Sequence, residues 1–155
     1  MPAVTVWRIV RPEYAETAYS GDGSRLNGGR FNSRGRSVVY ASESLSLAML
    51  EQLVRARSFA RLGQLLCVPA TFDDAGAELR AASELPAGWD ARPYTPASQS
   101  VGDAWLDAGR ALALRVPSVV VPFDRNVLIN PAHAAFRELR VGDPLAIPID
   151  PRLTG

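Results

Sequence analysis

The chain has 155 residues, of which 47% are hydrophobic and 21% charged, and its formal net charge is +1. This length and composition predict one globular domain spanning residues 1–155 and exclude a disordered chain. A net charge so close to zero disfavours nucleic acid as a direct partner. No apolar run approaches the roughly 18 residues that cross a membrane, and no secretion signal begins the chain. We therefore expect a cytoplasmic protein that contacts no membrane.

The reactive side chains are few. All 17 basic residues are arginines, so the sequence has no lysine for a P-loop, a Schiff base or a general base. One histidine, His133, and one cysteine, Cys67, are too few soft ligands for a zinc site, and we expect no metal. Cys67 lies in the apolar run LGQLLCVPATF, which predicts a buried thiol in a reducing cytosol. Without a G-x-S-x-G elbow, His133 does not indicate a serine hydrolase, and we expect it to pack against or cap a short helix.

The first 42 residues predict two strands with a long loop between them. Residues 4–10, VTVWRIV, are rich in the β-branched and aromatic residues typical of a strand. Residues 19–35 are rich in glycine, serine and asparagine, which predicts a loop of a length that is usually functional. Residues 37–42, SVVYAS, predict a short second strand.

A helix and a third strand are expected next. Ser42 or Ser44 can cap a helix that runs to about Phe59. Residues 65–72, LLCVPATF, predict a strand. Residues 73–100 contain several prolines and acids, so we expect a loop there with at most one short helical segment.

The last third of the chain alternates helix and strand signals only loosely. This irregular order predicts a mixed α/β domain around one central mixed sheet, not a regular doubly wound fold. The elements expected are a helix from Ser100 to about Leu112, a strand over residues 112–122 interrupted by Pro117, a short helix over residues 131–139 capped by Asn130, and a last strand over residues 144–149.

Arg30 follows two glycines, an arrangement suited to a phosphate group. The glycines allow the backbone to approach a ligand closely, and a guanidinium can donate two parallel hydrogen bonds to a phosphate. A glycine turn with a solvated arginine explains the same residues equally well. The earlier segment GDGSRL begins like a dinucleotide fingerprint but lacks its third glycine, so Rossmann-type binding is disfavoured.

Glu51 is a lone carboxylate in an apolar helical segment. Leu47, Leu50 and Val54 lie three or four positions from it, so helical periodicity directs Glu51 into or along the core. An unpaired carboxylate is costly to bury, so a buried Glu51 needs a cationic partner, a bound proton or a ligand. An ion pair with Arg55, one turn along the helix, would instead explain an exposed Glu51.

Two other side chains have a structural and a binding explanation. Tyr40 closes the strand before this helix, where its ring can stack on a flat heterocycle or pack within the sheet. Ser118 follows a proline in an apolar strand, and its buried hydroxyl needs a hydrogen-bond partner, which nearby backbone can supply.

The order of the motifs WRIV, NGGRFN, VVYAS, LAMLEQL, VPSVVVP and NVLINPAH resembles the RES domain family, from about Trp7 to His133. This resemblance implies a fold similar to that of ADP-ribosyltransferase toxins and an enzyme that consumes NAD as its substrate. It also implies a toxin of a bacterial toxin–antitoxin module, neutralised by a cognate antitoxin with an Xre-like DNA-binding portion.

The resemblance also assigns roles to particular residues. The family's arginine, glutamate and serine fall on Arg30, Glu51 and Ser118, which would form the catalytic set. Glu51 would stabilise the positive charge that develops on the ribose as nicotinamide leaves. Arg8 and Arg30 would hold the pyrophosphate, Tyr40 would stack on nicotinamide, and Ser118 would orient the ribose or Glu51.

The resemblance leaves the acceptor of the ADP-ribose open. We favour a protein acceptor, such as phosphoribosyl pyrophosphate synthetase, because the extra segment over residues 73–100 could dock a protein. Attack by phosphate or water would instead make an NAD-degrading toxin. More distant alternatives are a nucleic-acid-directed toxin that uses the arginine cluster of residues 25–36, and a non-catalytic domain held by its antitoxin.

Overall fold

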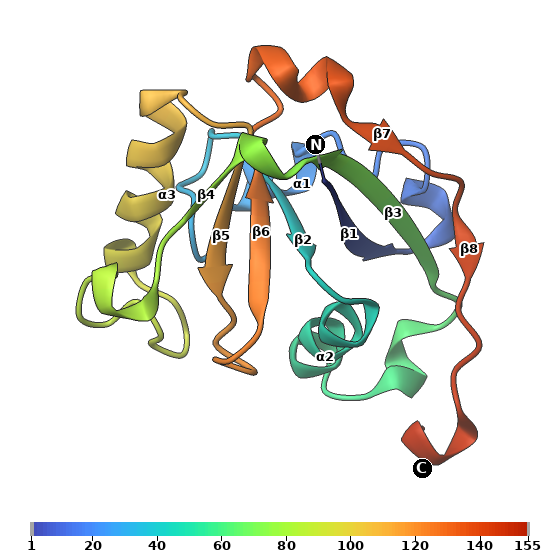
Figure 1. Ribbon diagram of the computed structural model, residues 1–155. Coiled ribbons are helices and arrows are strands. Elements are labelled where there is room, and N and C mark those ends of the chain that lie inside the picture. The colour runs from blue at the N-terminus through green and yellow to red at the C-terminus, as the bar shows by residue number, and fades with distance from the viewer. Residues whose placement is uncertain (1, 155) are drawn as a thin grey trace.

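The strands form one mixed sheet in the computed structural model, which describes residues 2–154 (Figure 1). Its order is β4-β5-β6-β2-β1-β3-β7, with β8 also paired to β3. All pairs are antiparallel except β4 with β5, so the predicted mixed α/β domain is confirmed. The strands are β1 (Ala3–Val10), β2 (Val39–Ser42), β3 (Leu66–Asp73), β4 (Ala77–Leu79), β5 (Ala113–Pro117), β6 (Arg125–Ile129), β7 (Arg140–Val141) and β8 (Leu145–Ala146).

The sheet is weakly joined between β1 and β2. Strand β1 pairs with β3 along all eight of its residues, but with β2 only where Trp7 lies opposite Ser42. Beyond this single pairing the ladder between β1 and β2 is interrupted, which leaves a gap in the sheet. Helix α2 (Leu45–Ala56) follows β2. In Figure 1, α2 and the turn that joins β5 to β6 lie together at one end of the sheet.

Helix α2 is capped by the second of the two predicted serines. The Ser44 side chain accepts a hydrogen bond from the Leu47 amide at 3.1 Å, whereas Ser42 belongs to β2. The helix ends at Ala56, three residues earlier than expected, because Arg57 adopts a left-handed conformation with φ of 68°. Leu47 and Ala48 are the residues that α2 buries.

Helix α3 (Pro96–Ala108) begins four residues earlier than the sequence predicted and also ends earlier. Thr95 caps it by accepting a hydrogen bond from the Ala97 amide at 3.3 Å, and Pro96 occupies the first helical position. Proline is favoured there because its fixed φ suits a helix and the missing amide would have had no partner. Val101 and Trp105 pack with Leu114 on one face of the sheet.

Other boundaries also differ from prediction. The expected loop over residues 19–35 contains the short helix α1 (Asp22–Asn27), and the segment over residues 73–100 contributes β4. The run over residues 112–122 is not one strand: β5 ends at Pro117, the chain turns, and β6 returns beside it. Strand β6 was not predicted because its short apolar run closely follows the longer apolar run of residues 112–122.

The carboxyl-terminal elements are shorter than expected. The helix predicted over residues 131–139 is a single 3₁₀ segment, Ala134–Glu138. His133 caps it by accepting a hydrogen bond from the Ala135 amide at 3.0 Å, which confirms the expected capping role. The last predicted strand is reduced to the two residues of β8, and Cys67 is buried as expected. Within residues 2–154, no helix is both long and apolar enough to cross a membrane.

Candidate active site

Glu51 lies half-buried on α2, at the end of the sheet where β5 finishes and β6 begins. Its Oε1 atom accepts two hydrogen bonds of 2.8 Å, from the Ser118 hydroxyl and from the Asn126 side-chain amide. Its Oε2 atom accepts no hydrogen bond from residues 2–154, and no ion pair in that range involves Glu51. The alternative ion pair between Glu51 and Arg55 is therefore not formed.

The apolar surroundings of Glu51 are only partly core. Leu47 is buried, but Leu50 and Val54 are 39% and 59% exposed. Phe123, on the turn between β5 and β6, is 97% exposed. Glu51 itself is half-buried and bonds to the buried Ser118, so it does lie along the core, at the rim of the sheet. The apolar neighbours Leu50 and Val54, which have the spacing of core residues, are exposed instead.

Ser118 is fully buried directly after β5, and its turn fixes the direction of its hydroxyl. The oxygen accepts hydrogen bonds from the amides of Val120 at 3.0 Å and Val121 at 3.1 Å. A serine hydroxyl has one proton to donate. Because both lone-pair directions face the turn, that proton is directed to Glu51. Backbone does supply partners for this buried hydroxyl, but the contact with Glu51 is an additional one.

Asn126 is a site residue that sequence reasoning missed. It lies on β6 directly opposite Ser42 on β2, and the Ser42 hydroxyl donates to its Oδ1 at 2.7 Å. That bond identifies the oxygen end of the amide and leaves the nitrogen to donate to Glu51. The available signal was a polar residue at the start of the apolar run VLI, but β6 itself was not predicted.

Arg30 lies in the glycine-containing loop, and backbone carbonyls hold its guanidinium in place. Its Nη1 atom donates to the carbonyls of Trp89 at 2.9 Å and Ala91 at 2.8 Å. Nε and Nη2 make no hydrogen bond with residues 2–154. Burial lowers the pKa of the Arg30 guanidinium, and the negative charge of Glu51 is the largest opposing influence. The structure therefore places Arg30 and Glu51 near each other without a direct ion pair.

Helix α3 holds the Arg30 loop through hydrogen bonds from three of its residues. All three point from one side of the helix at backbone or side-chain groups of residues 29–33. Ser98 donates to the Arg30 carbonyl at 2.6 Å, Gln99 donates to the carbonyls of Gly29 and Asn32 at 3.1 Å each, and Asp103 accepts from the Ser33 amide at 3.1 Å and from its hydroxyl at 2.6 Å.

Two glycines allow this contact. A Cβ atom on Gly102 of α3 would lie 1.6 Å from the Phe31 carbonyl oxygen, and one on Gly29 would lie 2.7 Å from the Tyr40 hydroxyl. Real Cβ atoms do not approach other atoms so closely. The glycine before Arg30 is thus required by packing against the protein itself, in addition to any ligand.

Tyr40 connects β2 to the same loop. Its hydroxyl donates to Asn32 Oδ1 at 2.6 Å and accepts from the Phe31 amide at 2.9 Å. Burial is the main cause that raises the pKa of Tyr40 above its ordinary value. The phenol is therefore a fixed support for the Arg30 loop. Stacking of its ring on a ligand stays a prediction.

Arg8 lies where β1 and β2 separate. Its Nη1 atom donates to the Tyr40 carbonyl, and its Nε atom is buried without a hydrogen-bond partner among the described residues. Burial is the main cause that lowers the pKa of Arg8, and the positive charge of Arg55 lowers it further. Arg8 thus bridges β1 and β2 where the two strands separate.

A model of the RES domain matches residues 5–150 of this chain. The chain belongs to the RES domain family. A RES toxin of Yersinia enterocolitica, named Toxin Res, is 34% identical over 149 residues, covering 96% of this chain and 98% of that protein. A Sphingobium protein named Prs ADP-ribosylating toxin is 38% identical over 152 residues, covering 95% and 94% of the two chains. The family resemblance found in the sequence is therefore confirmed.

The fold of this RES domain is also found in a solved structure. The crystal structure of the M. tuberculosis MbcT–MbcA toxin–antitoxin complex contains a chain that superposes with a TM-score of 0.75. The match covers 94% of this chain and 85% of that chain, at 15% sequence identity. So low an identity establishes the shared mixed α/β fold alone.

Proposed function

We propose that this RES domain toxin cleaves the nicotinamide–ribose bond of NAD and transfers ADP-ribose to a protein acceptor. The observation that carries the proposal is the Glu51 carboxylate, whose Oε1 is fixed by Ser118 and Asn126 while Oε2 accepts no bond from residues 2–154. Such an oriented charge is suited to a cationic transition state, because it needs no reorganisation when that state forms.

The proposed reaction separates charge in a way that Glu51 can assist. As the C–N bond breaks, its electron pair leaves with nicotinamide, which becomes neutral, and positive charge develops on the ribose. The free Oε2 of Glu51 would stabilise that charge or hold a ribose hydroxyl. The acceptor's nucleophile then bonds to the anomeric carbon, and its proton passes to solvent. Ser118 would act through Glu51 by keeping its other oxygen in place.

Binding of NAD would use the groups that the protein leaves unsatisfied. Arg30 has Nε and Nη2 available for pyrophosphate oxygens, in an orientation fixed by two carbonyls. Arg8 would add positive charge at the gap between β1 and β2. The Tyr40 ring would stack on nicotinamide, with its hydroxyl held in the Arg30 loop. A shell of bonded side chains around such a loop restricts its motion, which favours a preorganised site.

A protein acceptor is favoured by the relative whose name states an acceptor. That relative, the Prs ADP-ribosylating toxin, is 38% identical to this chain along nearly its full length. We therefore propose phosphoribosyl pyrophosphate synthetase as the first acceptor to test. Phosphate or water could attack the same anomeric carbon, which would make the protein an NAD-degrading toxin.

An antitoxin is the proposed partner, and an Xre-like DNA-binding portion is expected in it. The structurally similar MbcT was solved in a toxin–antitoxin complex. Here Leu50, Val54 and Phe123 are exposed on the two elements that flank Glu51. Exposed apolar groups beside a site are typical of surfaces that another protein covers. Since NAD is a cytoplasmic metabolite, the cytoplasm is the proposed location.

Mass spectrometry distinguishes the acceptors. Purified protein is incubated with NAD and a bacterial cell extract, with and without added phosphate. A mass increase of one ADP-ribose unit on an extract protein, at the expense of NAD, is the expected result. Free ADP-ribose or its phosphorylated form without any modified protein would identify an NAD-degrading toxin instead. Intact NAD throughout would contradict both reactions.

A further inference from the structure

A pocket lies beside the candidate active site, between the end of β1 and the last turns of α2. Its volume is about 270 Å³. Sites that hold whole drug-sized ligands measure roughly 300–1,000 Å³, so this one suits a fragment of a dinucleotide. Ile9, Leu62 and Leu65 give it an apolar wall against which a flat base can pack. No residue of the predicted catalytic or binding set lines it.

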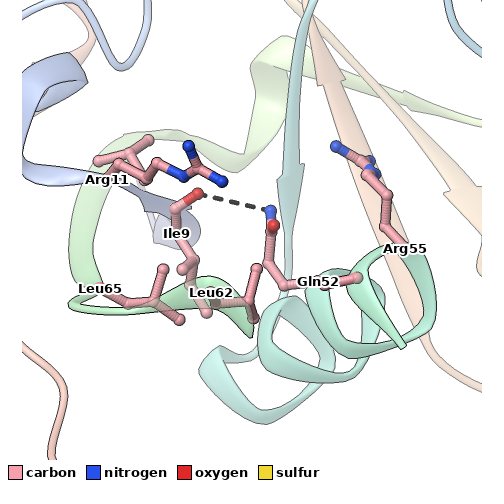
Figure 2. Close-up of a pocket in the computed structure, with 8 residues that line it drawn as sticks. Ile9, Arg11, Gln52, Arg55, Leu62 and Leu65 are labelled. Carbon is pink, nitrogen blue, oxygen red and sulfur yellow. Dashed lines mark hydrogen bonds between the residues drawn. The ribbon is translucent and has the colours of Figure 1, made fainter. Parts of the chain in front are cut away.

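Two arginines stand on opposite sides of this pocket. Figure 2 shows Arg11, which directly follows β1, and Arg55 on α2, with the side chain of Gln52 between them. Neither arginine forms an ion pair within residues 2–154. Gln52 donates to the Ile9 carbonyl at 3.5 Å, a long bond that leaves its carbonyl oxygen available. The pocket therefore combines an apolar wall, two unpaired cations and one free amide oxygen.

The positive charge around the pocket includes a buried group. Arg8 is two residues from Val10, which also lines the pocket, and its Nε is buried without a partner in the described chain. The positive charge of Arg55 lowers the pKa of Arg8, so the two guanidinium groups are close enough to repel each other. Like charges held close together cost free energy. An anionic ligand would remove that cost.

The pocket adjoins the site around Glu51 along α2. Gln52 follows Glu51 on α2, and Arg55 is one turn, about 5.4 Å, farther along the helix. Arg55 also lies near enough to Tyr40 for its charge to favour ionisation of that phenol. Arg55 thus lines the pocket at one helical turn from the candidate catalytic carboxylate.

We propose that this pocket binds the adenylate half of NAD, with Arg55 and Arg11 contacting phosphate oxygens and the adenosine packed against Ile9, Leu62 and Leu65. This inference rests on the proposed function, because it places the substrate's reactive end at Glu51. Gln52 would accept a hydrogen bond from the adenosine, either from a ribose hydroxyl or from the exocyclic amine. Neither arginine belongs to the residues that the family resemblance assigned.

The test compares NAD with nicotinamide mononucleotide, which carries the same scissile bond but lacks the adenylate half. The ratio of kcat/KM for NAD to that for the mononucleotide measures what the adenylate contributes. A bidentate charged contact to phosphate corresponds to about tenfold or more in affinity. We expect that ratio to fall about tenfold in Arg55→Gln and in Arg11→Gln. Arg61→Gln removes an exposed arginine of the same region that does not line the pocket, and it should keep the wild-type ratio.

Calorimetric binding of ADP-ribose provides a readout that does not depend on turnover. Weaker binding by about tenfold in Arg55→Gln, with wild-type binding in Arg61→Gln, supports the pocket even when the protein consumes no NAD. Wild-type ratios and wild-type ADP-ribose binding in both pocket variants would overturn the inference, while leaving the proposed NAD cleavage intact. Equal loss in Arg61→Gln would also overturn it, because the effect would then follow overall charge.

Discussion

Ser118 and Glu51, 67 residues apart in the chain, are joined by a 2.8 Å hydrogen bond at the end of β5. The serine accepts two amides of its own turn, so the proton it donates is directed at one carboxylate oxygen. Asn126 donates to that same oxygen. The result is a carboxylate with one oxygen fixed by two donors and the other open to a ligand.

The amide of Asn126 should matter to activity through the charge of Glu51. In Asn126→Asp, a second carboxylate would stand where a donor now lies 2.8 Å from Glu51. Two carboxylates at that distance cannot both be ionised near neutral pH, so one retains a proton. We expect NAD turnover to fall at least about tenfold at pH 7 and to recover partly as the pH rises. A pH profile of nicotinamide release checks this.

A matched variant separates charge from hydrogen bonding at the same position. Asn126→Ala removes the donor without adding a charge, so its loss of turnover should not recover at high pH. Identical pH profiles for the Asp and Ala variants would count against an electrostatic role for Glu51.

The close approach of α3 to the Arg30 loop predicts a strong effect of a single methyl group. In Gly102→Ala the new Cβ would lie 1.6 Å from the Phe31 carbonyl oxygen, so the helix or the loop must move. Overpacking of this kind costs about 1–3 kcal/mol or more. We expect the free energy of unfolding, measured in urea, to fall by at least that amount. Gly23→Ala is the control, because a Cβ there meets nothing within 4 Å.

The buried phenol of Tyr40 predicts a loss of stability in alkali. Burial raises the pKa of Tyr40 in the folded protein above its unfolded value, so the folded state retains a proton that the unfolded state loses. The stability of the wild type is therefore fully present below about pH 10 and falls as the pH rises above it. Urea unfolding at pH 8 and pH 11 measures the difference.

Substitution of Tyr40 tests that origin. Tyr40→Phe removes the hydroxyl that supports Asn32 and Phe31, so at pH 8 it should be about 1–3 kcal/mol less stable. The further decrease in its free energy of unfolding between pH 8 and pH 11 should be smaller than that of the wild type. Tyr94→Phe, at an exposed position, should match the wild type at both pH values. An unchanged alkaline loss in Tyr40→Phe would assign the effect to another group, such as Tyr19.

The sequence predicted the main strands in chain order, and the family resemblance implied that Ser118 orients Glu51 or the ribose. The contacts of this pair with Asn126 and with the turn after β5 were not predicted. Strands β1, β2 and β3 follow from their β-branched runs, and α2 from Ser44. Asn126 was not found because β6 is a short run directly after another apolar run. The contact of α3 with residues 29–33 has no local sequence signal. Gly102 is a poor helix former, and its role is clear only from the Phe31 backbone that packs against it.

Helical periodicity also did not predict the exposed apolar surface beside Glu51. Leu50 and Val54 have the spacing of core residues, yet they are exposed. The periodicity of apolar residues indicates which residues share a helix face. It does not report whether that face meets the core or a partner.

Nicotinamide release from NAD by the wild type and by Glu51→Gln tests the central claim most directly. Glutamine keeps an oxygen to accept from Ser118 and Asn126 but removes the negative charge. We expect the wild type to release nicotinamide and Glu51→Gln to be slower by about a hundredfold or more, with unchanged thermal unfolding. Glu138→Gln, at an exposed position, should equal the wild type. Equal rates for Glu51→Gln and the wild type would contradict the assignment of this carboxylate as the group that drives the chemistry.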